Sequence, residues 1–201
     1  MSVVDKVLVR IKRVKIGEPF LCGKFEGLGS RGSVNGALRR LAKTGVIERI
    51  SRGVYVRPLV HKDIGKICPG CIKVLRLISS SSGEIFQVHG LEALRRFGVG
   101  TRILVFPTFY TSGRTRTLVI GGLAVELFHA RKDWLQNPES LAGLALVAMF
   151  QLGKLSLDGT ICSMILRRLP CEELEKLMES KMPSWMRRQC EIAIKELSSK
   201  C

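Results

Sequence analysis

Residues 30–56 constrain the fold of this chain more than any other part of its sequence. Ser30 is a suitable N-cap for a helix, because its hydroxyl can accept a hydrogen bond from a backbone amide of the first turn. Gly45 is placed to end that helix. Between the two, apolar residues recur at helical spacing: Val34, Ala37, Leu38 and Leu41. The pattern predicts a helix over residues 31–43 with one buried side.

A β-hairpin is predicted directly after this helix. Two β-prone runs, residues 46–50 and 54–56, flank the polar segment Ser51-Arg52-Gly53, whose glycine suits a tight turn. Upstream, apolar spacing predicts a basic-faced helix over residues 3–15, and residues 19–26 are expected to form a short helix or a strand leading into one. This order of elements predicts a winged helix-turn-helix in residues 1–61, with the hairpin as the wing.

The outer side of the predicted 31–43 helix combines long cations with glycines. Gly32 and Gly36 lie at its centre, where the backbone carries no side-chain bulk. Arginine suits a bidentate contact with guanine and asparagine with adenine, whereas lysine more often meets phosphate. Tyr55 is expected to pack inside the wing. The candidate DNA-binding residues are Arg31, Ser33, Asn35, Arg39, Arg40, Lys43 and, at the wing tip, Arg52.

The charge of the chain favours a polyanionic partner. There are 33 Lys and Arg against 17 Asp and Glu, a formal net charge of +16. Residues 1–60 hold 13 of the cations and 4 of the acids, so the charge is densest in the N-terminal part. A basic helix face taken alone is usually a solvated surface. Here the cap, the glycine stop and the hairpin that follows favour binding to double-stranded DNA over that simpler explanation.

The remainder, residues 62–201, is predicted to form a mixed α+β domain with a short antiparallel sheet and a helical C-terminal third. Residues 58–70 are interpreted as a linker. Helices are expected over residues 72–80 and 90–97, a strand over 85–88, and a three-stranded meander from residues 103–106, 117–120 and 124–128. Further helices are expected to begin near Pro138, Asp158, Pro170 and Pro183.

Several short motifs resemble those of the AbiEi-type antitoxins of type IV toxin-antitoxin systems. Leu28-Gly29-Ser30-Arg31, Ala37-Leu38-Arg39-Arg40-Leu41, Gly45 and Arg52-Gly53-Val54-Tyr55 look like that family's LGSR, ALxRL, G and RGxY elements. Leu152-Gly153-Lys154 and Pro183-Ser184-Trp185-Met186 resemble its LGK and PxWM segments. The resemblance implies a protein that represses its own operon by binding operator repeats. It also implies antagonism of a nucleotidyltransferase-like toxin encoded beside it.

Two other functions fit the same residues. One is a plain transcriptional regulator of a mobile element or virus, with no toxin, whose second domain serves dimerisation or ligand sensing. The other is an RNA-binding protein. An enzyme is not expected, because the three histidines, His61, His89 and His129, share no triad-like spacing with an acid or nucleophile. Neither a Walker P-loop nor a GxGxxG motif is present, so no cofactor is expected.

The cysteines indicate neither a disulfide framework nor a metal site. Their number, seven, is odd, which suits a reducing cytoplasm. Cys68 and Cys71 form a CxxC pair that could be half of a zinc site, but no second pair follows, so free thiols are favoured. The sequence also shows no apolar stretch long enough to cross a bilayer and no secretion signal.

Two remaining groups each have a functional and a structural interpretation. Arg114 and Arg116 offer a second basic contact for DNA, or else the polar face of an edge strand, which is favoured. Trp185 with Met182 and Met186 offers an anchor for a partner, since aromatic residues often dominate interfaces. Core packing at the start of a helix is the default expectation for that group.

Overall fold

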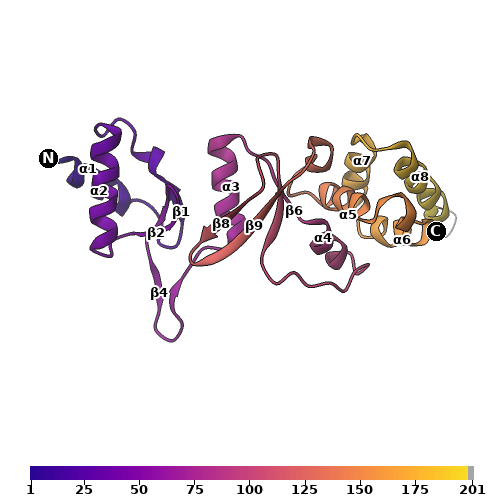
Figure 1. Cartoon of the computed structure of the whole chain (residues 1–201), viewed down its shortest axis with the longest axis horizontal. Helices are drawn as coiled ribbons and strands as arrows, with labels where there is room; N and C mark the ends of the chain where they lie inside the picture. The colour runs from indigo at the N-terminus through magenta and orange to yellow at the C-terminus, as the bar shows by residue number, and fades with distance from the viewer. Residues whose placement is uncertain (199–201) are drawn as a thin grey trace. The chain divides into compact units, whose positions relative to one another are not determined.

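The computed structural model, which describes residues 1–198, has the mixed α+β composition expected from the sequence (Figure 1). The chain divides into two compact units. The first unit contains Met1–Gly83 and Thr117–Val125, and the second contains Glu84–Arg116 and the residues from Glu126 onward. Each unit has its own hydrophobic core. The boundary predicted at residues 61/62 lies inside the first unit, and separate folding of residues 1–61 stays a prediction.

The first unit begins with helices packed beside a three-stranded antiparallel sheet ordered β1-β3-β2. Its elements are α1 (Val3–Lys12), β1 (Pro19–Leu21), the 3-10 helix η1 (Cys22–Phe25), α2 (Arg31–Lys43), β2 (Glu48–Ser51) and β3 (Val54–Val56). Ile11 of α1, Leu38 of α2 and Phe25 of η1 are fully buried in the core between them. The predicted 31–43 helix and the hairpin after it are confirmed, and residues 19–26 contain both of the expected elements.

Helix α1 ends three residues earlier than the sequence predicted. The guanidinium of Arg57, just beyond β3, donates hydrogen bonds to the carbonyl oxygens of Lys12, at 3.0 Å, and Val14, at 2.8 Å. Carbonyls at a helix C-terminus have no partner within the helix, and the Arg57 guanidinium supplies one at the end of α1. The spacing of apolar residues along a helix could not predict a contact between residues 43 or more positions apart.

The stretch interpreted as a linker forms a second hairpin instead. Strand β4 (Leu59–His61) pairs antiparallel with β5 (Gly65–Ile67). Gly65 has a φ of +74°, a conformation that favours glycine and that closes the turn. The glycine suggested a flexible connection in the sequence, whereas here it serves a tight turn. All six residues of the two strands are exposed.

The first unit is completed by α3 (Cys71–Ser82) and by the turn between strands β8 (Arg116–Ile120) and β9 (Leu123–His129). The backbone amide of Gly121 in that turn donates to the carbonyl of Ile50, at 2.8 Å. The thiol of Cys68 fills the space where a side chain at Gly121 would lie. Residues about 50 to 70 positions apart therefore meet at this turn.

The predicted meander is wrong in its first strand and in its pairing. Residues 103–106 form no strand; the next segment, β7 (Thr108–Thr111), does. The sheet is ordered β6-β7-β9-β8, with β6 (Phe86–Val88) antiparallel to β7 and β7 parallel to β9. All four residues of β7 are buried, whereas Ile103 and Val105 are more than 80% exposed. β-propensity indicated both runs, but only the tertiary fold decides which one finds partners.

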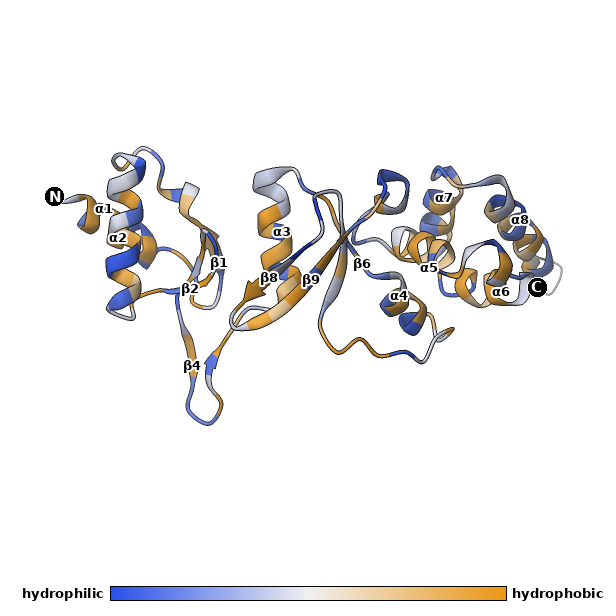
Figure 2. Cartoon of the chain, viewed as in Figure 1, coloured by the Kyte–Doolittle hydropathy of each residue, from blue (hydrophilic) through white to orange (hydrophobic). Residues whose placement is uncertain are grey.

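The second unit places a group of helices around the apolar helix α5 (Figure 2). Its helices are α4 (Gly90–Arg96), η2 (Lys132–Leu135), α5 (Leu141–Ser156), α6 (Gly159–Leu166), α7 (Cys171–Glu179) and α8 (Ser184–Ser198). The predicted starts near Asp158, Pro170 and Pro183 are confirmed to within one residue. Eight consecutive residues of α5, from Ala142 to Met149, are buried. Within residues 1–198, no helix has the length and apolar character needed to cross a membrane.

Candidate nucleic-acid interface

Helix α2 is capped at both ends by the side chains that flank it, Ser30 and Thr44. The Ser30 hydroxyl accepts a hydrogen bond from the Ser33 backbone amide, at 3.2 Å, and lies 2.8 Å from the Ser33 hydroxyl. At the other end, the Thr44 hydroxyl donates to the Leu41 carbonyl, at 3.1 Å. The side predicted to be apolar is buried, with Leu38 completely enclosed. The opposite side of α2 is therefore held in a defined orientation toward solvent.

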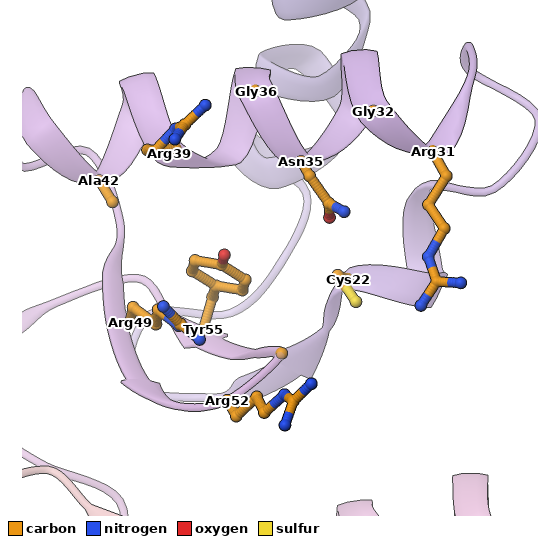
Figure 3. Close-up of a pocket in the computed structure, with 11 residues that line it drawn as sticks. Cys22, Arg31, Gly32, Asn35, Gly36, Arg39, Ala42, Arg49, Arg52 and Tyr55 are labelled. Atoms are coloured by element: carbon orange, nitrogen blue, oxygen red, sulfur yellow. The ribbon is translucent and has the colours of Figure 1, made fainter.

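A groove of about 610 Å³ separates the outer side of α2 from the β2–β3 hairpin (Figure 3). Its walls come from three elements. The lining residues are Arg31, Gly32, Asn35, Gly36, Arg39 and Ala42 of α2, Arg49, Arg52, Gly53 and Tyr55 of the hairpin and its turn, and Cys22 of η1. Figure 3 shows the Asn35 amide and the Tyr55 hydroxyl directed into the space between the helix and the hairpin.

The groove is strongly cationic. Four of its lining residues are arginines, and no acidic residue lines it. Within the described chain, none of these four guanidinium groups takes part in an ion pair or a side-chain hydrogen bond, so their donors are available to a ligand. The first unit as a whole carries 17 Lys and Arg against 5 Asp and Glu, a formal charge of +12 out of the +16 of the full chain. The groove thus lies in the positive part of the molecule.

Gly32 and Gly36 leave the backbone of α2 bare along the groove. A methyl group added at either position would meet no other atom within 4 Å, so the packing of the protein itself does not require glycine there. A glycine inside a helix costs about 1 kcal/mol relative to alanine. Two such residues on the groove side of one helix leave its backbone open to close approach from solvent.

The structure divides the predicted site residues into two groups. Arg31, Asn35, Arg39 and Arg52 line the groove together. The other three, Ser33, Arg40 and Lys43, are exposed on α2 but lie outside the lining. The hydroxyl of Ser33 is in contact with that of Ser30, so it serves the helix cap.

Arg49 is a groove residue that was not among those predicted from the sequence. It lies opposite Tyr55 in the β2–β3 pairing, and the register of that pairing shifts between Arg49 and Ser51. A β-bulge of this kind breaks the alternation that normally shows which residues of a strand share a face. Arg49 is exposed while Ile50 beside it is buried. The only sequence signal was its charge within a predicted wing strand.

Tyr55 packs in the hairpin, as predicted. It is 8% exposed, and its ring stacks on Phe20 with centroids 6.2 Å apart. Tyr55 also lines the groove, together with the four arginines. Within the described chain, no other residue hydrogen bonds to its hydroxyl.

The other candidates have structural roles. Arg116 makes a bidentate ion pair with Glu84, at 2.7 and 2.8 Å, and the hydrogen bond from Arg116 lowers the pKa of that carboxyl. β8, where Arg116 lies, is an edge strand, as favoured from the sequence. His89 caps α4 by accepting from the Leu91 amide, at 3.2 Å, and burial lowers its pKa. Met186 is fully buried in the second core, with Trp185 packed against it, which is the default expectation for that group.

The cysteines bring no metal-ligand cluster together. Burial, together with the nearby charge of Glu48, raises the pKa of the Cys68 thiol. Cys71 is the first residue of α3. No group of three or more His, Cys, Asp or Glu side chains suited to a metal ion occurs within residues 1–198.

Comparisons with known proteins identify a family without a described activity. Residues 6–177 match a family described as a family of unknown function, DUF6088. No curated protein and no solved structure matches the chain.

Proposed function

Because the chain belongs to the DUF6088 family, whose function is unknown, we propose a function from the groove itself: the protein binds double-stranded DNA. In this proposal residues 1–61 are a winged helix-turn-helix, with α2 as the recognition helix and the β2–β3 hairpin as the wing. The order of the elements, the packing of α1 against α2 and the antiparallel hairpin support that assignment.

The single observation that carries the proposal is the arginine groove with its bare helical backbone. The major groove of B-DNA admits an α-helix, and Gly32 and Gly36 allow the backbone of α2 to approach the duplex closely. Asn35 lies between arginines on the same side, which supplies groups suited to adenine and to guanine. Arg49 and Arg52 on the hairpin then reach the flanking phosphates.

We further propose that the protein is an autorepressor and antitoxin in the manner of the AbiEi family. The support is the resemblance of its short motifs, of which Arg31, Arg39 and Arg52 are groove residues. A cytoplasmic location and antagonism of a nucleotidyltransferase-like toxin belong to this proposal. Co-expression with the product of the adjacent gene tests it, since rescue of growth is expected from an antitoxin. Toxicity that the protein leaves unchanged, or a neighbour that is not toxic, favours the regulator without a toxin.

Mobility shifts test DNA binding directly. The probes are duplex DNA from the region upstream of the protein's own gene and a duplex RNA of the same sequence, each across a salt series. We expect preference for the DNA and a steep loss of affinity with salt, because each phosphate contact releases a counterion. Preference for the RNA would instead identify an RNA-binding protein, the third function considered.

Substitution of one groove arginine separates specific contacts from bulk charge. Arg39→Ala is expected to weaken binding to the preferred duplex by about 1–3 kcal/mol, with relaxed sequence preference if Arg39 contacts a base. Arg102→Ala removes the same charge from an exposed position of the second unit and serves as the matched control. Equal losses from the two variants would contradict the assignment of the groove as the binding site.

A further inference from the structure

The β4–β5 hairpin is an exposed arm of the first unit, and the arginine groove does not use it (Figure 1). Every residue from Leu59 to Cys68 is exposed. Three residues per strand, at about 3.3 Å per residue, give the arm a length of about 10 Å before its turn. A two-stranded hairpin without a core of its own contributes little stability. Packing within the first unit therefore does not explain why the chain forms this hairpin.

The base of the arm is anchored and its tip is not. At the base, Leu59 lies close to Gly17, and Lys66 makes an ion pair with Glu48, at 3.1 Å. At the tip, the Asp63 amide donates to the His61 ring, at 3.3 Å, which shapes the turn. Ile64, the next residue, is 74% exposed. An anchored arm thus presents one large aliphatic side chain at its end.

The charge around Ile64 indicates what kind of partner the arm fits. Lys62 and Asp63 precede it, Lys66 follows it in its ion pair with Glu48, and the unit that carries all of them has a formal charge of +12. A second copy of this chain would bring two such positively charged units together, which disfavours an interface between two arms. A duplex has the opposite charge, and its minor groove accepts aliphatic wedges such as Ile between base steps.

We propose that the β4–β5 hairpin is a second DNA contact, which inserts Ile64 into the minor groove and bends the duplex. This inference rests on the proposed function, because it requires that the first unit binds DNA. Lys62, two residues before Ile64, contacts a phosphate beside the inserted residue. Insertion unstacks one base step and kinks the DNA by about 20–90°, as with other side chains that wedge into the minor groove.

The bend angle of the DNA reports insertion of Ile64 better than the affinity does, because two opposing free-energy terms contribute to the affinity. Deforming the duplex costs several kcal/mol, and the contacts that the bend permits offset this cost. Removing the Ile64 side chain eliminates both the cost of deforming the duplex and the contacts that the bend permits. Ile64→Ala is therefore expected to abolish most of the bend while changing the affinity by less than about tenfold.

The experiment measures the distance between fluorophores at the two ends of the upstream duplex by energy transfer, with the full-length protein bound at saturation. The wild type and Ile103→Ala are expected to shorten this distance, and Ile64→Ala is expected to leave it near that of free DNA. Ile103 is a matched control, since it is an isoleucine 82% exposed in the second unit. Sedimentation of the wild type and of Ile64→Ala is run in parallel, and the same oligomeric state is expected for both.

Each contrary outcome has a distinct meaning. If the wild type binds the duplex without bending it, or if Ile64→Ala bends it as strongly as the wild type, the arm is not a wedge and the groove proposal stands. If Ile64→Ala dissociates an oligomer, the arm is an interface between copies of the chain, and the wedge is rejected. If the wild type binds no duplex DNA, the proposed function fails and the wedge fails with it.

Discussion

Gly32 and Gly36 are the residues whose presence in α2 the packing of the protein does not explain. Both positions face open space and both line the groove. If a ligand requires the bare backbone, stability and binding should respond in opposite directions to a methyl group. If the glycines were needed only for the fold, a methyl group would lower both the stability and the affinity for DNA. Substitutions at these two positions can therefore distinguish a role in binding from a role in folding.

Gly36→Ala is therefore expected to stabilise the protein by about 1 kcal/mol, because alanine is the better helix former. The same variant is expected to weaken duplex binding by about tenfold or more, which corresponds to a loss of about 1.4 kcal/mol. Chemical denaturation and mobility shifts measure the two effects. Gly159→Ala in α6, where an added methyl also meets no neighbour, is the control and should leave binding unchanged. Unchanged binding in Gly36→Ala would contradict close approach of DNA to α2.

A second residue-scale prediction concerns Glu92 on α4. Hydrogen bonds lower the pKa of its carboxyl from 4.5 to about 2. The largest effect comes from the hydrogen bond that Arg95 donates, and Arg96 donates a second one. A lowered pKa in the folded state means that the ionised carboxylate stabilises the fold above about pH 4.5. This stabilisation is lost as the pH falls toward 2.

Glu92→Gln should accordingly lower the free energy of unfolding by about 1 kcal/mol at pH 7, a value reduced for solvent screening of this partly exposed group. At pH 3 the loss should be less than about half of that. Urea unfolding at both pH values measures it. Glu179→Gln, at an exposed carboxylate of α7, is the control. A loss that is the same at pH 3 and pH 7 would show that packing, rather than the charge, is what Glu92 contributes.

At the scale of elements, the orientation of α2 depends on its N-terminal cap. Ser30→Ala removes the acceptor for the Ser33 amide and should destabilise the protein by about 1 kcal/mol, whereas Ser30→Asp should restore the cap. Thermal unfolding measures both variants. Because Ser30 does not line the groove, Ser30→Ala should reduce affinity only through disorder of the first turn, where Arg31 lies. An Asp variant as unstable as the Ala variant would contradict the capping role.

At the scale of the whole molecule, the two units have separate hydrophobic cores. A substitution in one core is therefore expected to destabilise only the unit that contains it. Leu38 is fully buried in the first core and Leu146 in the second. Each Leu→Ala substitution should cost about 2–5 kcal/mol in its own unit. Hydrogen exchange should report faster opening of α1 and α2 in Leu38→Ala, and of α5 and α6 in Leu146→Ala. Faster exchange across both units in either variant would indicate that the chain unfolds as a single cooperative structure.

Local signals in the sequence were enough to predict most helices and the first hairpin. The cap at Ser30, the apolar spacing from Val34 to Leu41 and the stop at Gly45 are short-range features, and they correctly predicted α2 and its buried side. From the same helix the sequence predicted an outer side with Asn35, Arg39, Arg40 and Lys43, and contacts from Arg31 and Ser33 near the N-terminus. Of these, Arg31, Asn35 and Arg39 line the groove. These predictions held because helical periodicity and capping depend on residues only a few positions apart.

Pairing between distant segments was decided only by the tertiary structure. β7 forms a strand, and residues 103–106 do not, because β7 pairs in parallel with β9. The hydrogen bond from Arg57 to the end of α1 likewise joins residues far apart in the chain. The bulge that places Arg49 at the groove is of the same kind, since it depends on the register between two strands. Propensity is a property of single segments, whereas burial and partner choice are properties of the assembled fold. For that reason local sequence patterns predicted most helices and the first hairpin, and only the folded chain determined which strands form and how they pair.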